Sequence, residues 1–297
     1  MKTLSIFFML MNIILWGCST TENATTDSNT SENSSKNTSN TSENSSETKQ
    51  NAPLVEAEVE QEMRRLLKLY DQGTPEEWAK ARTQLMNWPD EKYRTKALDG
   101  LCLMLFNRFR ITGAVVTFQK AQQEFKIIGK QAVPYLIVFM SNPKMTDNVS
   151  RKYCGDALAL IGKEAIPEIK EALKKSGQAK YHYDLIVALG ETQDKSAVPI
   201  LIEMTEESDY GRRSYAAESL GKISEAESIP PLLKLLNDEE EFVCVKAAKA
   251  LHSQKKFLKD SGQLSAIIQT LKNRKQGVSP ESDLYQELNR TLRTLQS

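Results

Sequence analysis

A proline motif that recurs at nearly constant spacing constrains the fold of this chain more than any other feature. Four segments share it, AVPYL, AIPEI, AVPIL and SIPPL, and their prolines, Pro134, Pro167, Pro199 and Pro230, are 33, 32 and 31 residues apart. A second pattern keeps the same period, because YAAESLGKI, from Tyr215, repeats YCGDALALI, from Tyr153, two periods later. Repeats of this length predict a row of supersecondary units, each of which buries its apolar face against the next unit.

Each unit is predicted to be a pair of helices joined by a polar turn. Proline is tolerated in the first turn of a helix, because the backbone N–H groups there have no helical partner. Apolar residues then follow at helical spacing, as in Val198, Leu201 and Ile202. The polar segments EESDYG and NDEEE separate the first helix of a pair from the second.

The second helix of each unit carries small residues and ends near a glycine. The alanine pairs 216–217 and 247–248 leave room for neighbouring helices to approach closely. Gly190 and Gly221 suit the left-handed conformation that commonly ends a helix. We therefore expect both glycines to be C-terminal caps.

This pattern resembles the HEAT-like repeats of bacterial proteins, especially the short variant found in phycobilisome lyases. The resemblance covers about Lys126 to His252. It implies an all-α fold, namely an α-solenoid of stacked antiparallel helix pairs, and it says little about function. We expect this repeat region to occupy 126–297 and to end in a capping helix.

Helices are also expected on both sides of the repeats. Residues 53–125 are predicted to contain three helices, over 56–70, 74–88 and 96–109. Thr74 followed by Pro75 is a typical helix start. The final helix, which would cap the row, carries one apolar stripe made of Leu284, Leu288, Leu292 and Leu295.

Residues 1–17 have the pattern of a signal peptide. A lysine at position 2 is followed by 13 mostly apolar residues, Leu4 to Trp16, which is too short a run to span a bilayer comfortably. The leader ends in LWGC, which resembles the lipobox of bacterial lipoproteins, although Trp16 stands where that family usually has a small residue. An ordinary cleaved signal peptide or a short membrane anchor is the alternative.

The lipobox resemblance implies that Cys18 becomes the N-terminus and carries the lipid. Several acyl chains on one residue would anchor a protein stably, where a single chain is marginal. In lipoproteins of bacteria with two membranes, Ser19 after the cysteine implies sorting to the outer membrane. We therefore expect a lipid-anchored protein of the bacterial cell envelope.

Residues 18–52 are expected to form a disordered linker behind this anchor. From Ser19 to Gln50 the chain is built almost entirely of Ser, Thr, Asn and Glu, without an aromatic or branched aliphatic residue. Such a composition cannot bury enough apolar surface to offset the loss of chain entropy. A flexible segment of this length reaches roughly 30 Å, enough to hold a folded body away from a membrane.

Composition excludes several classes of function. Lys+Arg and Asp+Glu are equal at 39 each. Because a nucleic-acid-binding domain is usually clearly basic, we expect no nucleic-acid partner. Cys102, Cys154 and Cys244 lie far apart in apolar helical runs and are expected to be core residues. No CxxC motif, Cys/His cluster, HExxH motif or glycine-rich phosphate loop occurs. We therefore expect no metal, no cofactor and no catalytic residue.

A candidate partner-binding face comes from charges that recur at equivalent positions of the second helices. On stacked helices such charges would form rows along one surface. The alternative is a solvated helix face with pairing one turn apart, and for His182 an ordinary surface position. The candidates are Arg151, Lys152, Asp156, His182, Arg212, Arg213 and Glu218.

These observations favour a non-catalytic interaction module that binds another protein or peptide of the cell envelope. A repeat fold provides an extended surface, and the expected anchor places that surface near a membrane. The alternative is an enzyme or enzyme-assisting subunit, similar to the lyases, that acts on a small molecule or a protein-bound chromophore. Export of the chain counts against that alternative, because such lyases work in the cytosol.

Overall fold

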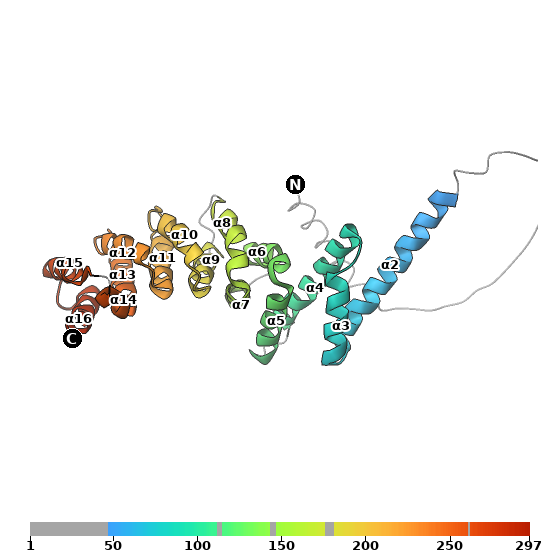
Figure 1. Ribbon diagram of the computed structural model, residues 1–297, viewed down its shortest axis with the longest axis horizontal. Coiled ribbons are helices and arrows are strands. Elements are labelled where there is room, and N and C mark those ends of the chain that lie inside the picture. Colours follow the sequence, from blue (N-terminus) through green and yellow to red (C-terminus); the bar gives the residue numbers. More distant parts are fainter. Residues whose placement is uncertain (1–46, 112–114, 143–146, 176–180, 261) are drawn as a thin grey trace, which may run out of the picture. The chain divides into compact units, whose positions relative to one another are not determined.

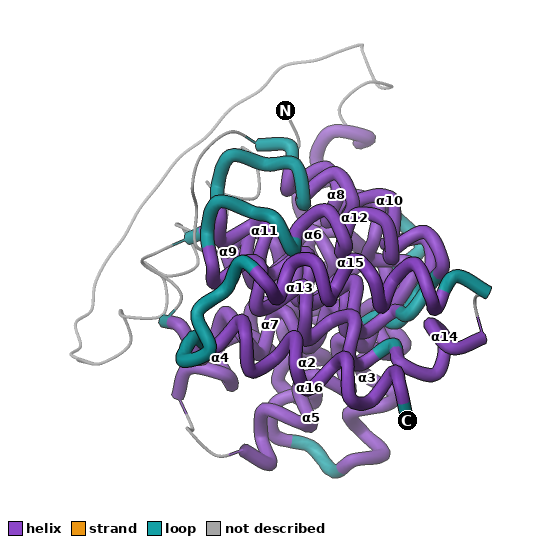
Figure 2. The backbone as a smooth tube through the Cα atoms, turned by 90° about the vertical axis from the view of Figure 1, so that its left-hand side faces the viewer, coloured by secondary structure: helices purple, strands orange, loops and turns teal. Residues whose placement is uncertain are grey.

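The computed structural model describes residues 47–111, 115–142, 147–175, 181–260 and 262–297, and every regular element in these ranges is a helix. Figure 2 shows helices and loops alone in this part of the chain. The predicted signal peptide, Cys18 and most of the predicted linker lie outside the described residues. The chain divides into two compact units, the first ending at Asp99 and the second running from Gly100 to Ser297.

The first unit contains α2 (Glu47–Gln72), α3 (Pro75–Met86) and the beginning of α4 (Glu91–Ile111). Helices α2 and α3 pack against each other around Leu66, Tyr70 and Leu85, which are almost fully buried. The predicted start of α3 is confirmed, since Thr74 and Glu77 each accept a hydrogen bond from the other's backbone N–H. This reciprocal capping satisfies two N–H groups that a helix start leaves without partners. Helix α2 begins at Glu47, within the last residues of the predicted linker, 18–52.

The second unit is a succession of helix pairs (Figure 1). In each pair, the first helix packs against the second helix that follows it in sequence. Four of these first helices begin after a short 3₁₀ turn, with proline in the first turn. The first helices are α6 (Val133–Ser141), α8 (Ile166–Leu173), α10 (Val198–Met204), α12 (Ile229–Leu235) and α15 (Leu264–Gln276). The second helices are α7 (Asn148–Ile161), α9 (Tyr181–Glu191), α11 (Tyr210–Ile223), α13 (Glu241–Ser253) and α16 (Asp283–Gln296).

The second helices stack directly on one another and form a continuous layer. Helix α5 (Val115–Ile128) begins the layer against α7, and α9, α11, α13 and α16 follow in order. A short helix, α14 (Lys255–Asp260), precedes the last pair. The alanine pairs 216–217 and 247–248 are fully buried between these helices, as predicted. The periodic sequence therefore becomes a solenoid, and its layer begins earlier than the first proline motif.

Gly190 and Gly221 are not left-handed caps, and that expectation is wrong. Both lie inside their helices, and the positive φ angles that follow belong to Gln193 (53°) and Ser224 (55°). A Cβ on Gly190 would lie 2.6 Å from the Cβ of Ser219 on the next helix. These glycines are needed because neighbouring second helices approach too closely for a side chain.

The predicted capping helix, α16, closes the layer. Its leucine stripe, Leu284, Leu288, Leu292 and Leu295, is at most 6% exposed and faces the preceding repeat. Each fully buried leucine stabilises the fold by about 1.5–3 kcal/mol relative to an exposed one. Thr291 on the same helix donates to the Ala248 carbonyl at 3.3 Å and joins the cap to α13. The final hairpin thus shields the apolar face of the last repeat.

Candidate functional site

Charged side chains one repeat period apart join the second helices. Arg151 Nε on α7 lies 2.9 Å from Asp184 Oδ2 on α9. Lys222 Nζ on α11 lies 2.7 Å from Glu191 Oε1 at the end of α9. Because equivalent positions on stacked helices are neighbours, a charge that recurs with the repeat meets its counterpart on the next helix. Arg151, one of the predicted binding residues, thus contributes to contacts between repeats.

Glu218 joins the next two second helices, α11 and α13. Lys246 on α13 donates to the Glu218 carboxylate, and Lys222 Nζ on α11 lies 3.6 Å from Glu218 Oε1. Burial opposes ionisation of Glu218, but the hydrogen bond and charge of Lys246, together with Lys222, outweigh it and lower the pKa of this carboxyl. Glu218 is therefore a charged link between repeats at neutral pH.

Lys152 follows the alternative interpretation of a solvated helix face, whereas Asp156 also accepts a hydrogen bond of 3.4 Å from Gln122 Nε2 on α5. Lys152 Nζ lies 3.0 Å from Asp156 Oδ2 one turn along α7, and the lysine side chain is 70% exposed. Exposed pairs at this spacing contribute about 0.3–0.5 kcal/mol. Of the seven predicted binding residues, Lys152 is the one whose side chain is mostly exposed.

His182 and Arg212 lie inside the interface between α9 and α11. Their residues are 1% and 7% exposed, so the expectation of a surface position for His182 is wrong. Arg212 Nη2 contacts His182 Nδ1, and Arg212 Nη1 lies 3.3 Å from Glu207 Oε1. Sequence alone could not show this, because the position of a charged residue on a helix does not tell which neighbouring helix covers it.

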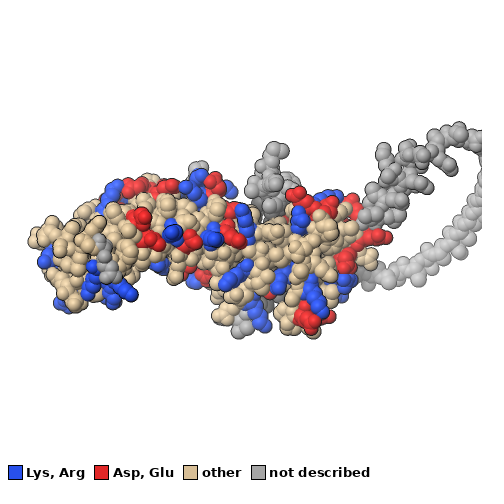
Figure 3. All heavy atoms as spheres, viewed as in Figure 1, with Lys and Arg blue, Asp and Glu red and all other residues tan. Residues whose placement is uncertain are grey.

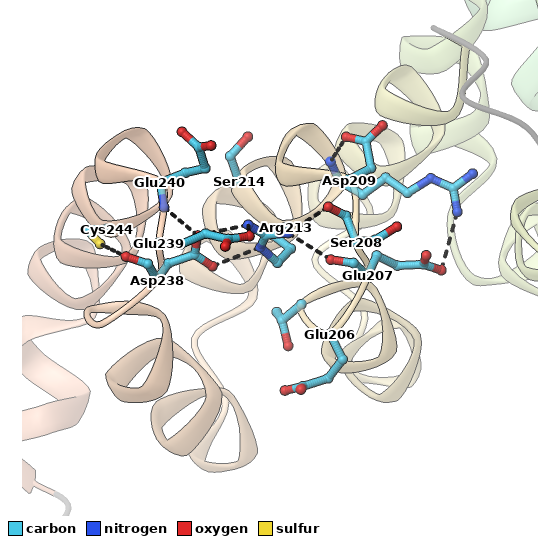
Figure 4. A network of polar contacts seen from close by, with 12 residues as sticks. Glu206, Glu207, Ser208, Asp209, Arg213, Ser214, Asp238, Glu239, Glu240 and Cys244 are labelled. Carbon is cyan, nitrogen blue, oxygen red and sulfur yellow. Dashed lines mark hydrogen bonds and ion pairs between the residues drawn. The ribbon is translucent and has the colours of Figure 1, made fainter.

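Arg213 connects two consecutive turns, as Figure 4 shows. Its Nη1 donates to the carbonyl oxygens of Glu207 and Ser208, each at 2.9 Å, in the turn between α10 and α11. Its Nε and Nη2 donate to the two oxygens of Asp238, at 2.8 and 2.9 Å, in the turn between α12 and α13. The hydrogen bond to Asp238 and the charge of that carboxylate raise the pKa of the Arg213 guanidinium, although burial opposes this, and the residue is 7% exposed. A two-pronged contact of this kind fixes both turns in one geometry.

Sequence reasoning missed the exposed apolar side chains beside these turns. Tyr210 begins α11 and is 55% exposed, and Phe242, the second residue of α13, is 53% exposed. Both follow acidic runs, in EESDYG and NDEEEF, one period apart. The sequence did carry a signal for these side chains, because an aromatic residue recurs at the end of a polar turn. We call residues 205–210 together with 236–242 the turn platform.

The remaining candidate chemistry stays within the core. Cys102, Cys154 and Cys244 are buried free thiols, and burial raises the pKa of Cys154 and Cys244. Among the described residues, no group of three or more His, Cys, Asp or Glu is placed to hold a metal ion. None of the helices described has the length and apolar character needed to cross a bilayer.

Comparison with known proteins agrees with this geometry. The family described as HEAT repeats matches residues 166–252. The described fold is an α-solenoid of HEAT-like helix pairs. No curated protein matches the chain.

Several solved structures are similar to this chain at low identity. Kap95p in a complex with RanGDP is similar at 15% identity and a TM-score of 0.46, and the match covers 78% of this chain and 33% of Kap95p. A designed armadillo repeat protein in complex with the peptide (KR)4 matches at 16% identity and a TM-score of 0.40, over 71% of this chain and 97% of that one. Phycocyanin lyase CpcE–CpcF from Nostoc sp. PCC7120 matches at 16% identity and a TM-score of 0.32, over 71% and 91%.

Proposed function

We propose that this protein is a non-catalytic scaffold that binds another protein or peptide in the bacterial cell envelope. The observation that carries the proposal is the continuous layer of second helices, whose neighbours are fixed to each other by buried and half-buried charged contacts. Such a layer presents side chains of several repeats in one fixed arrangement. An extended surface that is already ordered loses little entropy when it binds a partner.

The proposed location rests on the N-terminal sequence. The apolar leader and the LWGC segment support lipid attachment at Cys18, and Ser19 supports sorting to the outer membrane. The polar linker would let the folded body search a volume roughly 30 Å from its anchor. A tether of this kind raises the effective concentration of the scaffold near partners on the same membrane.

Crosslinking in intact cells, followed by purification of the tagged chain from the envelope fraction, tests the proposal. We expect a reproducible protein partner that is recovered with the wild-type chain. The matched control is Cys18→Ser, which should lose incorporated palmitate and leave the membrane fraction. Failure to recover any partner, together with turnover of a small molecule by the purified chain, would contradict the scaffold and favour an enzyme.

A further inference from the structure

Large apolar side chains on the surface are concentrated at one edge of the second unit. Among the described residues, four large apolar residues are more than half exposed, namely Ile127, Val149, Tyr210 and Phe242. Three of these four occupy the first or second position of a second helix: Val149 on α7, Tyr210 on α11 and Phe242 on α13. Because second helices run in the same direction, their first residues lie along the same edge of the layer.

The turn platform holds two of these side chains on a rigid base. Arg213 joins the turn before α11 to the turn before α13 through five hydrogen bonds, to Glu207, Ser208, Asp238 and Glu239. Asp209 caps α11 by accepting from the Arg212 backbone N–H at 3.1 Å. Tyr210 and Phe242 therefore project from helix starts whose positions relative to each other are fixed.

The platform is also strongly acidic. It contains seven carboxylates. The cations that contact its residues are Arg212, Arg213 and Lys234, which pair with carboxylates, and Lys246, whose Nζ lies 5.5 Å from the centre of the Phe242 ring, so the local balance is 4 minus 7, or −3. Glu239, Glu240 and Glu241 are exposed, with the Glu239 side chain at 82%. Figure 3 shows acidic side chains over this part of the second unit, with basic ones among them. Asp209 caps α11, Glu239 pairs with Arg213, and the helix dipole of α13 favours Glu240 and Glu241 at its start. None of these roles accounts for the exposed phenylalanine beside the glutamates.

We propose that the turn platform binds an extended, Lys- and Arg-rich segment of a partner protein that carries two apolar side chains three residues apart. The proposal rests on the scaffold function and names the partner chemistry. Neighbouring packed helices lie 8–10 Å apart in general, and an extended chain rises about 3.3 Å per residue, so residues i and i+3 span about 10 Å. The two apolar side chains pack on Tyr210 and Phe242, while the basic ones meet the glutamates.

The test measures binding of a fluorescent peptide to the full chain by anisotropy. The probe has about six residues, with two leucines three positions apart and lysine or arginine elsewhere, so that it spans about 20 Å, or about two helix spacings. A second probe has the same composition with its leucines adjacent, and a third replaces the basic residues with glutamate. Tyr210→Ser and Phe242→Ser remove the apolar contacts, and a triple variant converts Glu239, Glu240 and Glu241 to glutamine.

Matched controls lie away from this edge. Ile127→Ser removes an equally exposed apolar side chain near the end of α5, and Glu227→Gln removes an exposed carboxylate from the 3₁₀ turn before α12. We expect the spaced basic probe to bind most tightly. Phe242→Ser or Tyr210→Ser should weaken it about tenfold or more, as truncation of a central anchor usually does. The glutamine triple variant should weaken binding and reduce its dependence on salt, and both controls should bind as wild type.

Three results would overturn the inference. The spaced basic probe shows no saturable binding, all three probes bind equally, or the Phe242→Ser and triple variants bind the spaced basic probe as tightly as wild type. If envelope crosslinking recovers a partner whose binding ignores these substitutions, the scaffold function stands and the platform is the wrong surface. If the probe binds at the platform, but crosslinking recovers no cellular partner and the purified chain turns over a small molecule, the scaffold function fails although the peptide-binding surface is correct.

Discussion

Replacing Gly190 by alanine tests how closely the second helices of neighbouring repeats pack. Gly190 lies within α9, where alanine is favoured over glycine by about 1 kcal/mol in an unconstrained helix. The added Cβ would lie 2.6 Å from Ser219 Cβ and 2.7 Å from its Cα, so α9 and α11 must move apart. Overpacking of this kind costs about 1–3 kcal/mol, so after the gain in helix propensity the net loss of stability is up to about 2 kcal/mol.

Gly155 provides the matched control within the same layer. A Cβ there would lie 3.4 Å from the Asp184 carbonyl oxygen, close to ordinary van der Waals contact. Gly155→Ala should therefore leave the free energy of unfolding unchanged or raise it by up to about 1 kcal/mol, because the helix propensity gain remains. Urea denaturation followed by far-UV circular dichroism compares the two variants with wild type.

Gly190→Asn separates close packing from a left-handed cap. Asparagine tolerates a positive φ, so a cap would accept it better than alanine. Close packing predicts the opposite order, because asparagine is larger and meets the same backbone on α11. Equal stability of Gly190→Ala and Gly155→Ala, or a more stable Gly190→Asn, would refute the reasoning.

Three further changes have defined outcomes. Arg213→Met should lower the free energy of unfolding by about 3 kcal/mol or more in urea denaturation, because Asp238 would stay buried without its counter-charge. An unchanged unfolding midpoint would argue against the contact of Arg213 with both turns. The pKa of Glu218 is lowered from 4.5 in the folded protein, so its pairing with Lys246 stabilises the fold above pH 4.5, and this stabilisation is lost as the pH falls through the folded-state pKa. The unfolding midpoint of Glu218→Gln should therefore fall less steeply with decreasing pH than that of wild type. Thr74→Ala should cost about 1 kcal/mol through loss of the α3 cap, with faster amide exchange in its first turn.

Most of the helical architecture follows from local chemistry that the sequence displays. Proline in the first turn, apolar residues at helical spacing and a polar turn are all short-range signals, and all recur with one period. Thr74 and the leucine stripe of α16 are likewise recognisable from neighbouring residues alone. Such features were predictable because each depends on the few residues around it.

The roles of the glycines and the charged residues depend on the next repeat. A glycine that ends a helix and one that admits a neighbouring helix look alike in sequence, and Gly221 meets Ala250, which is 29 residues later. In the sequence of its own helix, Arg213 is indistinguishable from a solvent-facing charge, and only the fold shows that the turn containing Asp238 lies beside it. Because such contacts are made across a repeat period, the sequence of one helix could not assign them.

Hydrogen exchange of the full chain tests most directly whether each repeat is stabilised by its neighbours. Exchange measured peptide by peptide should compare wild type with Gly190→Ala. In a nearest-neighbour stack, faster exchange should be confined to α9, α11 and the first helices packed on them, with α5 and α16 unchanged. A uniform increase across all helices of the second unit would show a single cooperative core and contradict the solenoid account.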